Sequence, residues 1–211
     1  RESSVHIMTA QFKLMPAAAA LVSSIQQELG LPHFAARTMV AHGVNSLEEA
    51  RAFLAPDIER DWLNPYTIPR LGAAVVRLER AVRDDERIVV FGDFDLDGIS
   101  ATTVLTRGLQ FLGANAAPLI PKRFEEGYGI TPPAFERAKA FKPDLIVTVD
   151  CGIASGDIAP TVLAEGIDLV VTDHHEPADL VPEGVPVTDP KLSADCPSRE
   201  LAGAGVALKL V

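Results

Sequence analysis

The stretch that most constrains this chain is residues 88–100, where an apolar run is followed at once by three aspartates at alternate positions. The run Ile88–Phe91 predicts a buried strand of a parallel sheet. Asp93, Asp95 and Asp97 come next, and carboxylates this close together repel one another unless a cation lies among them or some carry a proton. Hard divalent ions such as Mg²⁺ and Mn²⁺ select oxygen ligands. The stretch therefore predicts a metal site at the carboxyl end of the strand.

Three other interpretations of this stretch stay open at this point. D-x-D-x-D-G also begins an EF-hand calcium loop, but the twelfth position of that loop, normally a bidentate glutamate, is Val104 here. F-D-L-D-G is similar to the first motif of the haloacid dehalogenase phosphatases, in which Asp95 would be a covalent nucleophile and Asp97 its acid/base partner. A solvated acidic turn is disfavoured, because carboxylates beside a buried strand are costly without a counter-charge.

Composition limits the class of protein. The chain has 211 residues, of which 47% are hydrophobic, so it can bury one large or two small cores. A formal net charge of −10 argues against a protein that coats DNA, although an acidic metal site in a nucleic-acid enzyme would be neutralised locally by its ions. Only 6% of the residues are aromatic, so the sequence does not predict a base-stacking platform.

The cysteines and the chain ends bear on location and completeness. Cys151 and Cys196 do not form a disulfide framework, which suits a reducing, cytoplasmic location. No apolar run reaches membrane-spanning length. The chain begins at Arg1 and stops at Val211 inside a helical pattern, which suggests a fragment of a longer protein.

The first third of the sequence predicts a small helical segment. Helices are expected over residues 17–29 and 33–41, and a third begins at Ser46, with Glu49 forming a capping box. The proline-punctuated stretch N-P-Y-T-I-P-R at 64–70 marks a boundary. We therefore expect two parts, residues 1–68 and residues 69–211.

From residue 71 onward the pattern alternates between helix and strand. An amphipathic helix is expected over Leu71–Arg83. Strands are then predicted over residues 88–91, 116–120, 145–149 and 169–171, with helices over residues 99–112, 133–141 and 157–165. This alternation predicts an α/β fold with a doubly wound, mostly parallel sheet.

Groups with metal-ligand chemistry follow three of the four predicted strands. In folds of this kind, ligands bind outside the carboxyl ends of the strands. The first strand is followed by Asp93, Asp95 and Asp97, the third by Asp150, the fourth by Asp173, His174 and His175, and the second by Lys122 and Arg123. Asp and His together suit Mn²⁺ or similar ions, and a pair of such ions can promote phosphoryl displacement. The side chains of Lys122 and Arg123 would then receive phosphate oxygens. The adjacent histidines are expected to point in different directions, one to metal and one to substrate.

Three motifs resemble the DHH phosphoesterase superfamily: V-F-G-D-F-D-L-D-G-I at 90–99, V-T-V-D-C-G-I at 147–153 and V-T-D-H-H-E-P at 171–177. Two further stretches, R-F-E-E-G-Y-G at 123–129 and L-A-G-A-G-V-A at 201–207, resemble its single-strand-specific exonuclease branch more than its small-nucleotide branch. The D-H-H motif also argues against the dehalogenase interpretation.

The resemblance implies a role for each site residue. Asp95, Asp97, Asp150 and His174 would bind two Mn²⁺ or Mg²⁺ ions, with Asp150 bridging them. His175 would lie against the scissile phosphate, and Asp93 and Asp173 would orient ligands or balance charge. The implied reaction is 5′→3′ hydrolysis of single-stranded DNA to nucleoside 5′-monophosphates in repair and recombination. The implied state is a monomer, with single-strand-binding protein and a recombination helicase as partners.

The same resemblance implies parts that residues 1–211 do not contain, namely a fourth aspartate ligand, a second domain and an OB-type module. The site is therefore expected to be incomplete. Two alternatives stay open: a DHH phosphodiesterase acting on short oligonucleotides or cyclic dinucleotides, and a non-catalytic scaffold that binds DNA or replication proteins. Cys151, beside Asp150, is expected to be a packed residue and not a nucleophile.

Overall fold

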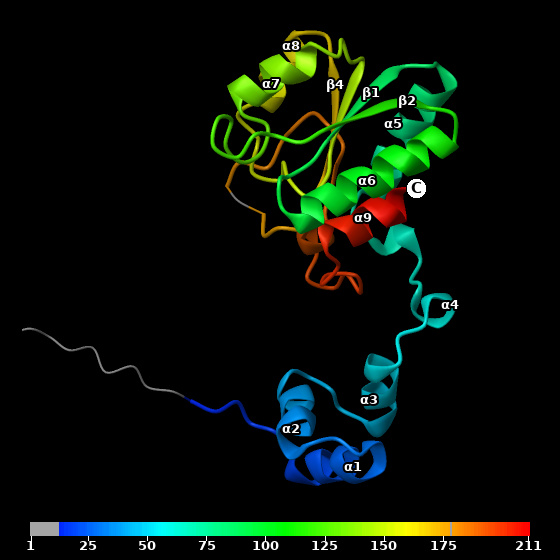
Figure 1. The fold of residues 1–211 in the computed structure, drawn as a ribbon, viewed down its shortest axis with the longest axis vertical. Coiled ribbons are helices and arrows are strands. Elements are labelled where there is room, and N and C mark those ends of the chain that lie inside the picture. The colour runs from blue at the N-terminus through cyan, green and yellow to red at the C-terminus, as the bar shows by residue number, and fades with distance from the viewer. Residues whose placement is uncertain (1–12, 178) are drawn as a thin grey trace, which may run out of the picture. The chain divides into compact units, whose positions relative to one another are not determined.

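The computed structural model describes residues 13–177 and 179–211 (Figure 1). The chain divides after Trp62 into two compact units, which are described separately. The helices of the first unit are α1 (Ala19–Leu29), α2 (His33–Ala41), α3 (Leu47–Leu54) and α4 (Ile58–Asp61). They enclose a small core of Val22, Ile25, Ala36 and Ala50. The helices predicted from the apolar spacing of this segment are confirmed.

The predicted capping box at the start of α3 is half formed. The Ser46 side chain accepts a hydrogen bond from the backbone N–H of Glu49 at 3.0 Å, as a capping residue should. The Glu49 carboxylate, however, accepts from the backbone N–H of Asn45 at 2.8 Å and not from that of Ser46. The reciprocal half of the prediction was therefore wrong by one residue.

The second unit, Leu63–Val211, is built on a five-stranded parallel sheet with the order β2-β1-β3-β4-β5. Its strands are β1 (Arg87–Phe91), β2 (Asn115–Leu119), β3 (Leu145–Thr148), β4 (Asp168–Thr172) and β5 (Val187–Thr188). Four of them are the predicted strands, so the predicted fold class is confirmed. The fifth was missed, because a strand of two residues carries no readable periodicity.

Helices cover both faces of this sheet (Figure 1). One face packs on α5 (Leu71–Arg83), α6 (Leu96–Phe111) and α9 (Gly203–Leu210), and the other on α7 (Pro132–Lys139) and α8 (Ala159–Ala164). Two short 3₁₀ helices, η1 (Pro65–Thr67) and η2 (Pro190–Leu192), complete the unit. In the central strands all four residues of β3 are buried, as expected for a sheet covered on both sides.

The register brings the strand ends together at one edge of the sheet. Phe91 of β1 lies opposite Leu119 of β2 and Thr148 of β3, and Thr148 lies opposite Val171 of β4. The loops that follow these strands therefore leave the sheet side by side. As for membranes, none of the helices within residues 13–177 and 179–211 combines the length and the hydropathy needed to cross one.

Candidate metal centre

The loop after β1 turns directly into helix α6. Asp95 is the N-cap of this helix, and its Oδ1 accepts a hydrogen bond from the N–H of Gly98 at 2.9 Å. The helix therefore begins at Leu96 and not at Ile99 as predicted, because an aspartate of the motif itself supplies the cap. A Cβ atom at Gly98 would lie 2.6 Å from Cα of Asp93, so the loop can fold onto the helix only with glycine here.

Asp97 lies in the first turn of α6 and contacts the N-terminus of α9. Its Oδ2 accepts from the N–H of Gly203 at 2.7 Å, and its Oδ1 from the N–H of Ala204 at 2.8 Å. Free N–H groups at a helix N-terminus stabilise a carboxylate by hydrogen bonding and by the helix dipole. The L-A-G-A-G-V-A stretch thus holds the Asp97 carboxylate in place, a role that the sequence did not reveal.

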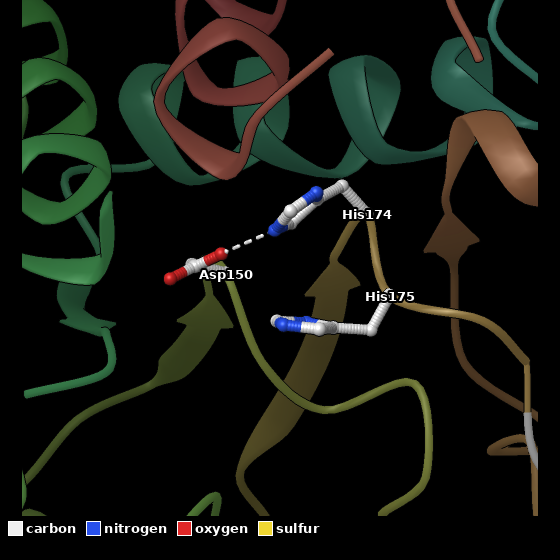
Figure 2. Close-up of side chains that lie close together, drawn as sticks. All are labelled: Asp150, His174 and His175. Carbon is white, nitrogen blue, oxygen red and sulfur yellow. Dashed lines mark ion pairs between the residues drawn. The ribbon is translucent and has the colours of Figure 1, made fainter. Parts of the chain in front are cut away.

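Asp150 follows β3 with its backbone in the left-handed region, at φ 61°. Its side chain is buried, and burial raises the pKa of its carboxyl group. Oδ1 lies 2.9 Å from Nε2 of His174, and Figure 2 shows the two groups facing each other. The distance suits an ion pair, yet Oδ1 has no well-aligned hydrogen bond within the described part of the chain. A buried oxygen without a hydrogen-bond partner calls for an explanation, and an ion bound by this carboxylate and the imidazole would provide one.

The D-H-H motif is held by the aspartate that opens it. Asp173 is fully buried and accepts hydrogen bonds from the backbone N–H groups of Ile153 at 2.9 Å and His174 at 2.7 Å. Its Oδ1 lies 2.7 Å from Nδ1 of His175. Burial alone would raise the pKa of Asp173, but these hydrogen bonds outweigh it and the net pKa is lowered. The ionised Asp173 in turn raises the pKa of His175.

The two imidazoles lie against the same site. Their ring centroids are 4.4 Å apart, and in Figure 2 both rings extend from the loop after β4 toward Asp150. Nε2 of His174 also lies 3.4 Å from Oδ2 of Asp97. The adjacent rings extend to the same side of the loop, contrary to the expected difference in direction, and their partners differ, Asp150 for His174 and Asp173 for His175. The division into one metal-binding and one substrate-facing histidine stays a prediction.

The potential ligand atoms form two groups that share one residue. Ligand atoms of Asp150, His174 and His175 lie within 4.8 Å of one another, and so do those of Asp93, Asp95 and Asp150. Burial raises the pKa of Asp93, whose Oδ1 has no hydrogen-bond partner in residues 13–177 and 179–211. A cation would satisfy these buried oxygens, so the donor set fits two divalent ions with Asp150 between them. In this geometry Asp93 can bind metal directly, in addition to its predicted orienting role.

Asp189 is a buried carboxyl group that sequence reasoning missed. It follows the short strand β5 and is fully buried. Its Oδ1 accepts from the N–H of Lys191 at 2.7 Å, whereas its Oδ2 has no partner among the described residues. Burial raises the pKa of Asp189 to about 6. The signal was absent because β5 was not predicted, so the T-D-P sequence did not read as a strand end.

Tyr128 and the two predicted phosphate-binding cations lie in the loop between β2 and α7. The Tyr128 hydroxyl lies 3.3 Å from Nδ1 of His175, a contact that sequence reasoning also missed. Arg123 lies over the Phe94 ring, 4.9 Å from its centroid. Lys122 points to Glu125 instead, with Nζ 2.8 Å from the carboxylate.

Two aromatic rings, those of Phe94 and Tyr128, lie near this site. The Tyr128 ring lies 6.5 Å from that of Phe94 and 6.1 Å from that of His175. Two aromatic side chains, Phe94 and Tyr128, therefore lie close to the candidate metal ligands. Cys151, by contrast, is fully buried, and burial raises the pKa of its thiol well above the usual value, which agrees with a packed, unreactive residue.

A parallel sheet with carboxylates and imidazoles gathered at one edge defines the class to which this chain belongs. The profile of the DHH family, N-terminal domain, matches residues 87–211, and the chain is a member of that family.

Relatives within the family are named single-stranded-DNA-specific exonuclease RecJ. The chain is 37% identical over 190 residues to RecJ of Bacillus subtilis (strain 168), which covers 90% of this chain and 24% of the relative. It is 38% identical over 184 residues to RecJ of Escherichia coli (strain K12), and this alignment covers 86% of this chain and 31% of the relative. The chain thus spans less than a third of the length of either relative.

Solved structures agree with this relationship. A RecJ exonuclease bound to manganese aligns with a TM-score of 0.62 and 40% identity, over 68% of this chain and 36% of that one. RecJ from Thermus thermophilus in complex with Mn²⁺ aligns with a TM-score of 0.66 and 32% identity, over 93% of this chain and 27% of that one. The similarity to the latter extends into the N-terminal helical unit.

Proposed function

We propose that this chain carries the catalytic core of a metal-dependent exonuclease that hydrolyses single-stranded DNA 5′→3′ to nucleoside 5′-monophosphates. In this proposal residues 69–211 form the catalytic domain, and residues 1–68 a helical segment that precedes it. The observation that carries the proposal is the position of Asp150 in both groups of ligand atoms, because a carboxylate shared by two cations is typical of two-metal phosphodiesterases. The substrate class, single-stranded DNA, is taken from the name of the RecJ relatives.

The proposed function of each site residue follows from its position in the metal centre. Asp95, Asp97, Asp150 and His174 would hold two Mn²⁺ or Mg²⁺ ions, with Asp93 close enough to add an oxygen. When bound, such ions lower the pKa of water and neutralise charge on the phosphate. Asp173 keeps Nδ1 of His175 engaged, which leaves Nε2 as the atom that can face the scissile phosphate. The raised pKa of His175 makes the imidazole a better hydrogen-bond donor to an anionic substrate.

The cations of the β2–α7 loop would bind the DNA backbone unequally. Arg123 lies next to Phe94 of the metal-binding loop, so it can contact a phosphate close to the site. Lys122 is already paired with Glu125 and would contribute less. Single-stranded DNA is the partner that this arrangement suits. A monomeric state, single-strand-binding protein and a recombination helicase are further proposals that rest on the family resemblance alone.

The experiment that tests the function is degradation of a single-stranded oligonucleotide in Mn²⁺, labelled at the 5′ end in one reaction and at the 3′ end in another. The proposal expects labelled mononucleotide at once from the 5′ label and a ladder of shortening products from the 3′ label. Asp150→Ala is the matched control and should give neither. Rapid hydrolysis of a dinucleotide with none of the long strand would favour a small-oligonucleotide phosphodiesterase instead. Mn²⁺ binding with no hydrolysis of either substrate by the full-length protein would point to a non-catalytic scaffold.

A further inference from the structure

A cavity of about 420 Å³ adjoins the metal centre on the side of His175. Its wall includes Tyr128, Ile130, Ile153, Ser155, Ile158 and His175. Among the proposed metal ligands, neither Asp97 nor His174 is one of the described lining residues, so the cavity lies beside the site and not within it. A volume of this size lies within the range of about 300–1,000 Å³ typical of small-molecule sites.

Away from His175, the lining disfavours phosphate and favours a neutral, flat group. Apart from His175, the ionisable side chains that give the wall its charge are acidic, Asp157, Asp173 and Glu176, and no lysine or arginine is among the described lining residues. Carboxylates repel a phosphate, while the half-exposed Tyr128 ring offers apolar surface and the three isoleucines of the wall are buried. Arg123 lies outside this wall, over Phe94. The phosphates of a substrate and its neutral part are therefore directed to different sides of the site.

Tyr128 connects the cavity to the reacting centre. Its ring lines the wall, and its hydroxyl lies 3.3 Å from Nδ1 of His175 and 3.5 Å from the backbone oxygen of Asp150. A group stacked on this ring would thus be separated from the proposed scissile phosphate by a single residue, His175. Nucleobases stack on aromatic rings whatever their identity.

We propose that this cavity binds the nucleoside next to the scissile phosphate, with its base against Tyr128. The proposal rests on the proposed nuclease function and deepens it by naming the part of the substrate that the cavity takes. A base held in a duplex is stacked and paired and cannot enter such a cavity, whereas a base of a single strand enters at little cost. The cavity would therefore contribute to selection of single-stranded substrates.

The kinetic test compares an unmodified oligonucleotide with two that carry an abasic residue at the first or the second position. We expect one of the two abasic substrates to lose about tenfold or more in kcat/KM, the loss of one stacked base. Ser155→Phe should narrow the cavity, because Ser155 lines the wall and its Oγ lies only 3.5 Å from the position that a Cβ atom on Gly129 would take. Ser155 itself is outside the proposed catalytic machinery. This variant should raise KM on the unmodified strand and abolish the abasic effect. Thr161→Phe, exposed on α8 and outside the wall, is the matched control.

A binding measurement separates failure of this proposal from failure of the nuclease function. Calorimetry with a deoxynucleoside 5′-monophosphate should give affinity at least about tenfold above that of deoxyribose 5-phosphate, and Ser155→Phe should remove the difference. This result is expected whether or not the chain hydrolyses DNA. Equal affinity for the two ligands, or a Ser155→Phe variant that behaves as wild type, would overturn the proposal. Equal kcat/KM for all three oligonucleotides would do so as well.

Discussion

Replacement of Gly203 by alanine tests whether the N-terminus of α9 positions the metal ligands. A Cβ atom at Gly203 would lie 2.4 Å from Oδ1 of Asp150 and 2.7 Å from its Cβ and Cγ atoms. Carbon and its neighbours pack at about 3.5–4.0 Å, so either Asp150 or the helix must move by roughly 1 Å. A shift of the helix would also lengthen the two hydrogen bonds that its N–H groups donate to Asp97.

The size of the effect follows from these two consequences. Overpacking of a closed site costs about 1–3 kcal/mol in unfolding free energy, against a gain of at most about 1 kcal/mol in helix propensity. A displacement of about 1 Å in a catalytic carboxylate reduces turnover by roughly 10²-fold. We therefore expect Gly203→Ala to lower Mn²⁺ affinity by at least about tenfold, in line with the loss when a ligand's support is disturbed.

The assay is urea unfolding of the metal-free chain together with Mn²⁺ titration followed by electron paramagnetic resonance. Gly72→Ala in α5 is the matched control, because a Cβ atom there meets only Tyr66 at 3.8 Å, an ordinary contact. The control should keep wild-type Mn²⁺ affinity and equal or exceed the wild type in stability. If Gly203→Ala binds Mn²⁺ as tightly as the control does, α9 does not position these ligands and the reasoning is wrong.

Three further predictions concern single side chains. Asp150→Ala should abolish Mn²⁺ binding and turnover while the metal-free fold persists, because a buried charge is removed with the ligand; wild-type activity in a nuclease assay would exclude the shared-ligand role. Asp189 has a pKa raised to about 6, so the folded state binds a proton that the unfolded state releases, and stability falls as pH rises from about 4 through 6. Urea unfolding of metal-free protein should show Asp189→Asn gaining about 1–3 kcal/mol in unfolding free energy over the wild type across this range. If stability depends on pH in the same way in both proteins, the prediction is wrong. In fluorescence anisotropy, Arg123→Ala should weaken binding of a single-stranded oligonucleotide by about tenfold or more, and Lys122→Ala by less than about threefold. The reason is that, of these two residues, Lys122 is the one already paired with a carboxylate, that of Glu125. Equal losses would show that the Lys122–Glu125 pair does not matter.

The sequence determined the sheet and most of the site, because both depend on local patterns. The apolar runs at β1, β3 and β4 are long enough to show their period, and the residues that follow them are one step along the chain. Parallel strands end at a common edge, so the sequence alone was enough to place Asp95, Asp150 and His174 together. The strand order was not needed for that conclusion.

Contacts between residues far apart in the chain were decided by the tertiary structure. Asp97 is paired with Gly203 across 106 positions, and no local pattern links an aspartate to the start of a helix that far away. Asp189 reaches this edge of the sheet only through β5, whose two residues are held in the sheet by pairing with β4. The cavity beside His175 is likewise formed by loops after β2, β3 and β4 that meet only when the sheet is assembled. Sequence periodicity reports burial of a segment, whereas packing decides which segments meet, and the identity of those neighbours depends on the whole fold.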